Sequence, residues 1–237
     1  MDLPFSVPAS LAPGLVIAPM TKEDTDAAAV VYYDSFGTDP ANGSWWPKDL
    51  APLLSWCSGR MRMKLSDPDV RIFKVNDAET GEMVAYARWD VPKGSTTFGK
   101  WMGGDVESVV DEKTTTATPP EYPEGGNVEI ASRFFSALGE SQKRHKTDDM
   151  LGLSLLCVSP KHFRKGIATA LLVPMLDIAD AEGRKSYLEA TAAGKPVYER
   201  LGFRQVEVLS FDWDELTSKR NGLYKNFVMI RDPVAKK

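Results

Sequence analysis

Residues 151–191 constrain the fold more than any other part of the chain. Residues 151–158 are an apolar run about as long as one buried strand, and Ser159 and Pro160 end it because proline cannot donate to a strand ladder. A basic turn follows at 161–165, and a strongly apolar helix then runs to about residue 182 before Gly183. Residues 186–191 read as a second strand. This order predicts two parallel strands joined by a right-handed crossover.

The basic turn at the start of this helix is a candidate phosphate site. The first turn of a helix leaves backbone N–H groups unpartnered, and the helix dipole adds positive charge there. Gly166 and Ala168 have little or no side chain, so that a ligand can approach the backbone, while Arg164 and Lys165 add positive charge. Many such units carry glycine and basic residues for packing and solubility alone, so this segment by itself leaves both interpretations open.

A second motif, Tyr198-Glu-Arg-Leu-Gly-Phe203, stands about thirty residues further on. The two motifs, in this order and at this separation, resemble the GCN5-related N-acetyltransferase (GNAT) superfamily over residues 150–208. In that family a Gln/Arg-x-x-Gly-x-Gly/Ala motif holds the pyrophosphate of acetyl-CoA, and Gly166 and Ala168 fit its last two positions. Phe163 stands where the family prefers Gln or Arg, and Thr191 where it often has Asn.

The resemblance implies a fold and a cofactor, acetyl-CoA. The fold class is α/β (α+β): a mixed, mostly antiparallel central sheet with a parallel central strand pair splayed into a V, and helices on both faces. The pantetheine arm would enter the V and pair with main-chain groups of the first strand. The cofactor-binding residues expected on this basis are Leu156, Cys157, Val158, Phe163, Arg164, Lys165, Gly166, Ile167, Ala168 and Thr169.

The resemblance also implies direct attack of a neutral amine on the thioester. Tyr198 stands where many members place the acid that protonates the departing thiolate; the alternative is that it only packs against the cofactor. Glu189 shares a strand face with Tyr187 and is the candidate base; the alternative is a structural carboxylate. Glu129 and His145 are weaker candidates, and no metal-ligating constellation competes.

These features favour an acetyl-CoA-dependent N-acetyltransferase whose acceptor is an amine, most simply of a small molecule. The alternative is a catalytically silent acyl-CoA-binding or regulatory module on the same fold, which the departures at Phe163 and Thr191 would permit. A dinucleotide-binding domain is disfavoured, because the glycine spacing Gly-x-Gly-x-x-Gly is missing. The sequence does not identify the acceptor.

The whole chain of 237 residues is interpreted as one domain with an inserted loop at 93–126, which is rich in glycine, proline and threonine. A net charge of −4 argues against a general nucleic-acid binder. Cys57 and Cys157 stand 100 positions apart and are expected as reduced core residues. With no signal peptide or apolar span, we expect a cytoplasmic monomer or homodimer without membrane or nucleic-acid partners.

The remaining elements follow from periodicity and capping residues. Residues 1–12 are expected to be extended and loosely held. Trp45 and Trp46 fall in a polar loop, where they either line an acceptor pocket or cap the core edge. The expected strands are residues 14–20, 70–76, 83–92, 203–209 and 225–231, and the expected helices run from Thr21 to Phe36, 49–65, 127–142 and 196–201.

Overall fold

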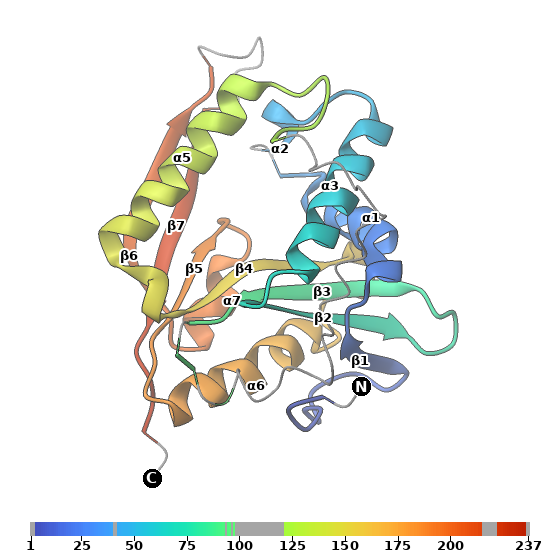
Figure 1. Ribbon diagram of the computed structural model, residues 1–237, viewed down its shortest axis with the longest axis vertical. Helices are drawn as coiled ribbons and strands as arrows, with labels where there is room; N and C mark the ends of the chain where they lie inside the picture. Colours follow the sequence, from blue (N-terminus) through green and yellow to red (C-terminus); the bar gives the residue numbers. More distant parts are fainter. Residues whose placement is uncertain are drawn as a thin grey trace.

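The computed structural model describes residues 3–39, 42–92, 94–95, 97, 121–214 and 222–235 (Figure 1). In this part of the chain, seven strands form one sheet in the order β1-β2-β3-β4-β5-β7-β6, and only β4 and β5 run parallel. The mixed, mostly antiparallel sheet is therefore confirmed. The strands are β1 Leu15–Pro19, β2 Val70–Asp77, β3 Met83–Asp90, β4 Leu151–Val158, β5 Ser186–Ala190, β6 Arg204–Asp212 and β7 Leu223–Arg231.

Helices cover both faces of the sheet (Figure 1). On one face α6 packs on residues such as Phe73 and Trp89, which are fully buried. On the other face α1, α3 and α5 cover residues such as Tyr86 and Tyr187. The strand β3 is consequently buried on both sides, because its alternating side chains enter different cores. The helices are α1 Thr25–Phe36, α2 Asn42–Trp45, α3 Leu50–Leu65, α5 Val128–His145, α6 Ile167–Ala181 and α7 Lys195–Arg200.

The parallel pair opens into the expected V. Its register joins Leu151 to Ser186, Gly152 to Tyr187 and Leu153 to Leu188, and it ends there. The strand β4 continues to Val158 on β3 alone, after an irregularity in the ladder between Leu153 and Leu155. The main-chain groups of the second half of β4 that face β5 therefore have no strand partner among the described residues.

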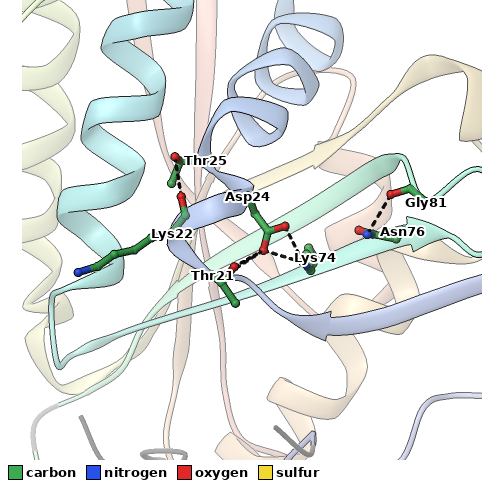
Figure 2. A network of polar contacts seen from close by, with 7 residues as sticks. All are labelled: Thr21, Lys22, Asp24, Thr25, Lys74, Asn76 and Gly81. Atoms are coloured by element: carbon green, nitrogen blue, oxygen red, sulfur yellow. Dashed lines mark hydrogen bonds and ion pairs between the residues drawn. The ribbon is translucent and has the colours of Figure 1, made fainter. Parts of the chain in front are cut away.

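The first helix is tied to the sheet by a polar network that Figure 2 shows. The N–H of Thr21 donates to Asp24 Oδ2 at 2.8 Å, which completes the capping box expected from the sequence. The ammonium of Lys74, on β2, lies 2.6 Å from both oxygens of the same carboxylate. Burial opposes ionisation of Asp24, but these hydrogen bonds outweigh it and lower the pKa of this carboxyl.

The N-terminal segment differs from its prediction. Leu11 is buried in the core beneath α6, and Leu3 and Phe5 pack against the same core. The Phe5 ring meets Phe73 edge-on with centroids 5.1 Å apart, and Ala12 N–H donates to Lys165 O at 3.0 Å. The prediction of a loosely held segment was therefore wrong, because apolar side chains spaced along this proline-rich segment pack against the core that the sheet shares with α6.

The inserted segment is described only in part. Most of residues 93–126 lie outside the described residues, so the expectation of a single domain with one inserted loop stays a prediction. Residues 121–126 lead into α5, and Asn127 caps this helix by accepting from Ile130 N–H at 3.2 Å. The helix continues to His145, three residues beyond the expected end at Gln142.

A buried ion pair joins the C-terminal part of α6 to β7. The Arg231 guanidinium, on β7, donates to both oxygens of Asp180 at 2.6 and 2.7 Å, and both side chains are nearly buried. Its Nε donates to Leu201 O at 2.9 Å. This guanidinium therefore joins α6, β7 and the end of α7.

Candidate functional site

A cavity of about 870 Å³ lies where β4 and β5 separate. Leu156 and Val158 line one wall from β4, and Tyr198 and Val197 line another from α7. The turn before α6 forms the mouth. Of the residues expected to bind the cofactor, those that line this cavity are Leu156, Val158, Phe163, Arg164, Gly166, Ile167, Ala168 and Thr169.

The turn at 164–166 has a backbone shape suited to an anion. Arg164 and Gly166 both have positive φ, 62° and 75°. The first helical hydrogen bond runs from Ala170 N–H to Gly166 O at 2.9 Å, so the N–H groups preceding residue 170 have no partner within the helix. Left-handed residues in a turn that leads into a helix N-terminus can gather free N–H groups into a concave nest.

The structure gives Gly166 a second role that the sequence did not reveal. A Cβ atom at this position would lie 1.8 Å from Ser10 O and 2.7 Å from Ser10 C. The missing side chain therefore makes room for the N-terminal segment. Glycine is required here twice, by the positive φ and by the contact with residues 10–12.

A second cavity, of about 540 Å³, lies on the α1–α3–α5 side of the V. Helices α1, α2, α3 and α5 and strands β3, β4, β5 and β7 contribute to its walls, and aromatic residues such as Trp45 and Phe134 form much of them. Phe36, Glu189, Thr191 and Tyr224 line both cavities. The two cavities therefore meet at the open end of the V, as a donor site and an acceptor site would.

Glu189 stands at this junction. Its Oε1 accepts from the Tyr187 hydroxyl at 2.8 Å and from Gln142 Nε2 at 3.0 Å. Burial raises the pKa of Glu189, and these two hydrogen bonds offset that effect only in part. A carboxylate held in place and made more basic by burial is suited to take a proton from an ammonium group.

Tyr198 lines the larger cavity from α7 and is 8% exposed. Burial raises the pKa of its hydroxyl, so the group stays protonated near neutral pH. Its ring packs edge-on against Phe203 with centroids 6.1 Å apart. This placement is compatible with a proton donor for a thiolate and equally with a packing role.

Other sequence candidates lie away from the junction. The Cys157 side chain is fully buried in the core beside Tyr86, and burial raises the pKa of its thiol to about 12, so the side chain is inert. Lys165 is exposed and does not line the cavity. Glu129 pairs with Arg133 on α5, and His145 Nε2 lies 3.0 Å from Glu207 Oε2. Their roles are surface and inter-element ion pairs.

Most of the residues that line the smaller cavity were not identified from the sequence. Arg60 and Arg88 line it from α3 and β3, and Asn226 and Tyr224 line it from β7. Trp45 is almost fully buried, as a residue that caps the core would be, and it also lines this cavity. One signal was present: Arg88 is the only charged side chain inside the apolar run 83–89.

Comparisons with known proteins agree with this architecture. Residues 133–212, from α5 to β6, match the family model of the acetyltransferase (GNAT) domain. A structure of histone acetyltransferase HPA2 and related acetyltransferase from Corynebacterium glutamicum shares 20% identity, with 94% of this chain and 99% of that chain covered and a TM-score of 0.54. The PaiA N-acetyltransferase of Thermoplasma acidophilum, in complex with coenzyme A, shares 11%, with coverages of 92% and 98% and a TM-score of 0.51.

A third similar structure is the C-terminal condensation domain of Ebony in complex with beta-alanyl-dopamine, at 12% identity, coverages of 92% and 98%, and a TM-score of 0.57. At these identities the structural matches establish the fold alone. No curated protein matches the chain. No helix in the described part of the chain is long and apolar enough to cross a membrane.

The splayed parallel pair lies within the segment that matches the acetyltransferase domain, so the fold and the match together indicate the acetyltransferase class. The chain therefore carries, over residues 133–212, a match to the GNAT acetyltransferase domain, on a fold that it shares with solved acetyltransferases. It is accordingly an acetyltransferase that takes its acetyl group from acetyl-CoA.

Proposed function

We propose that the protein transfers the acetyl group of acetyl-CoA to the amine of a small molecule by direct attack, with the cofactor in the 870 Å³ cavity and the acceptor in the 540 Å³ cavity. The observation that carries this proposal is that the two cavities meet at Glu189, at the point where β4 and β5 separate. Two substrates held on either side of one junction react with much of the entropic cost already met by binding.

The chain supplies a role for each group at the junction. The nest at 164–168 would hold the diphosphate, and the unpaired main chain of Leu156–Val158 would hold the pantetheine arm. Glu189 would accept a proton from the acceptor ammonium, directly or through water. Tyr198 would donate a proton to the departing thiolate. Main-chain N–H groups of β4 would stabilise the oxyanion of the tetrahedral intermediate.

The modest volume of the smaller cavity, about 540 Å³, supports a small molecule as the acceptor. Its lining comes from helices on one face of the sheet and from the strands beneath them, and large aromatic side chains form part of its walls. A protein lysine would have to thread a long side chain into such a cavity, whereas a free amine of modest size fills it.

Calorimetric titration with acetyl-CoA and detection of free thiol over a panel of small amines test this proposal together. We expect binding of acetyl-CoA with one-to-one stoichiometry and release of coenzyme A that depends on the amine. Binding without thiol release for any amine would favour the silent acyl-CoA-binding module, and absence of binding would overturn both.

A further inference from the structure

Within the described part of the chain, two arginines line the acceptor cavity without forming an ion pair. They are Arg88, at the centre of β3, and Arg60, on α3. The described arginines that do form ion pairs are Arg133, Arg144, Arg184 and Arg231. The Nε of Arg88 is moreover buried with no hydrogen-bond partner among the described residues.

The Arg60 guanidinium contacts an aromatic ring and a main-chain oxygen and forms no ion pair within the described residues, although the charge of Glu121 lies near enough to act on it. The guanidinium lies over the Trp56 ring, with Cζ 5.0 Å from the centroid, and its Nη1 donates to Glu121 O at 3.4 Å. Burial lowers the pKa of Arg60, and the nearby charge of Arg88 lowers it further. A guanidinium nevertheless stays protonated in proteins, so two neighbouring positive charges face this cavity.

Carboxylates also line the cavity, but they do not pair with these arginines. The Asp90 carboxylate accepts the hydroxyl of Ser154. Asp69 and Asp148 line the cavity as well, and within the described ranges neither forms an ion pair with an arginine. Lys64, the other cation in the lining, is held by Asp67 at 3.0 Å.

The opposite side of the cavity carries hydrogen-bond acceptors. Glu189 stands there on β5, and beside β5 runs β7 with Asn226, which is 5% exposed. The Oδ1 atom of Asn226 has no partner among the described residues. An ammonium group placed between Glu189 and Asn226 would satisfy both and would point toward the cofactor cavity that Glu189 also lines.

We propose that the acceptor is an amine that also carries a carboxylate, an apolar amino acid or a close analogue, with its carboxylate on Arg60 and Arg88 and its amine at Glu189. This inference rests on the proposed function and names its substrate class. A planar carboxylate fits a guanidinium through two parallel hydrogen bonds, and one anion relieves the repulsion of two adjacent cations. Tyr32, Phe36, Trp45 and Phe134 supply an apolar wall for the side chain.

Matched pairs of acceptors test the inference in the wild-type chain. Phenylalanine with phenethylamine, tryptophan with tryptamine, and leucine with isoamylamine compare an amine with and without a carboxylate. β-Alanine with O-phosphoethanolamine compares a carboxylate with a phosphate. In the first three pairs we expect kcat/KM for the best carboxylate-bearing member to exceed that for its partner by roughly 10- to 100-fold, the range for a charge-assisted hydrogen bond.

Variants localise the effect. Arg88→Gln is expected to lower kcat/KM for the carboxylate-bearing acceptor by roughly 10- to 100-fold, mainly through KM. The value of kcat/KM for the matched amine without a carboxylate, and the affinity for acetyl-CoA, should each stay within about threefold of wild type. Arg60→Gln repeats the test if Arg88→Gln does not fold. Arg62→Gln removes the same charge from the same helix outside both cavities and should change nothing.

The outcomes separate this inference from the proposed function. Equal or better acetylation of the amines without a carboxylate would overturn the carboxylate acceptor while keeping the acetyltransferase. Preference for O-phosphoethanolamine over β-alanine would replace the carboxylate by a phosphate and overturn the assignment. Acetyl-CoA binding with no acetylation of any carboxylate-bearing acceptor would also overturn it.

Discussion

The two cavities that meet at Glu189 are built in different ways. The larger one is shaped by the backbone: a strand pair that separates after Leu153, a turn with two positive-φ residues and a helix N-terminus. The smaller one is shaped by side chains from many helices and strands, among them two arginines and several aromatic rings. A site made of backbone leaves a short motif in the sequence, because only certain residues adopt its conformations, whereas a site made of side chains leaves scattered positions.

Because the two cavities are built differently, substitutions in each should affect a different property. Substitutions at the acceptor cavity should alter which amine reacts and leave acetyl-CoA binding intact. Substitutions at the turn should alter acetyl-CoA binding whichever amine is offered. The variants below test that division in order of decreasing expected effect.

Glu189→Gln should have the largest effect, because it acts at the junction of the two cavities. Loss of the proton acceptor should lower kcat by roughly 100- to 10,000-fold, while the affinity for acetyl-CoA stays within about threefold. Steady-state kinetics and calorimetric titration measure the two quantities. A loss of less than about fivefold in kcat would leave Glu189 a structural carboxylate.

The same variant has a signature in stability, which serves as its control for folding. Because burial raises the pKa of Glu189 in the folded state, the native protein binds more protons than the unfolded chain between the two pKa values. The contribution of this group to the free energy of unfolding is complete below the unfolded pKa and is lost as pH rises through the folded pKa. Glu189→Gln should therefore be no less stable than wild type at pH 8, as thermal unfolding would show.

Ala168→Glu should have the next largest effect, confined to the backbone-built cavity. The residue lies in the first turn of α6 and lines the cavity. A glutamate at a helix N-terminus is favourable for the helix itself, but here its charge would meet a diphosphate. Acetyl-CoA affinity should fall by roughly 100-fold, since like charges at partly desolvated contact repel by several kcal/mol. Ala168→Ser is the uncharged control and should stay within about threefold of wild type.

A substitution at Ala168 tests the diphosphate site more directly than one at Gly166. Any side chain at residue 166 would first collide with Ser10 O, so loss of binding there would report on the docking of the N-terminal segment as much as on the phosphate. A thermal unfolding transition of Ala168→Glu equal to that of wild type, with unchanged acetyl-CoA affinity, would place the diphosphate elsewhere.

The sequence predicted the backbone-built half of the molecule well. The strand over 151–158 agrees with β4, and the parallel return at 186 agrees with the start of β5. Periodicity and turn residues are local, so they could be identified without knowledge of the fold. The contact of Gly166 with Ser10 could not be predicted, since it joins segments that lie far apart in the sequence.

The side-chain-built half was largely beyond prediction. Arg60 and Arg88 lie on α3 and β3 and come together only when both pack beside α1. Nothing local distinguishes Arg60 from Arg62, which lines neither cavity. The packing of residues 3–12 depends likewise on a core formed by α6 and by strands that are distant in the sequence. Contacts between segments distant in the sequence determine where these residues lie, and such contacts cannot be inferred from a single sequence.

Tyr198→Phe tests the far end of the larger cavity with a smaller effect. If the hydroxyl donates a proton to the departing thiolate, kcat should fall by roughly tenfold, because a thiolate leaves readily near neutral pH and needs little help. The KM for acetyl-CoA should stay unchanged, since the ring and its contact with Phe203 remain. A kcat equal to that of wild type would assign the tyrosine a packing role alone.

Arg164 should have the smallest effect and tests most directly whether backbone or side chain makes the phosphate site. Its side chain is exposed and its φ of 62° is unfavourable for any residue with a Cβ. Arg164→Gln and Arg164→Gly lose the same charge, so acetyl-CoA affinity should fall by about threefold in both, and less at high salt. Only Arg164→Gly removes the left-handed strain, so it should gain about 1 kcal/mol of unfolding free energy over Arg164→Gln. Calorimetric titration at two salt concentrations and denaturant unfolding give the two numbers. A loss of affinity beyond about 30-fold would mean that the guanidinium, and not the nest of N–H groups, holds the diphosphate, and the contrast between the two cavities would fail.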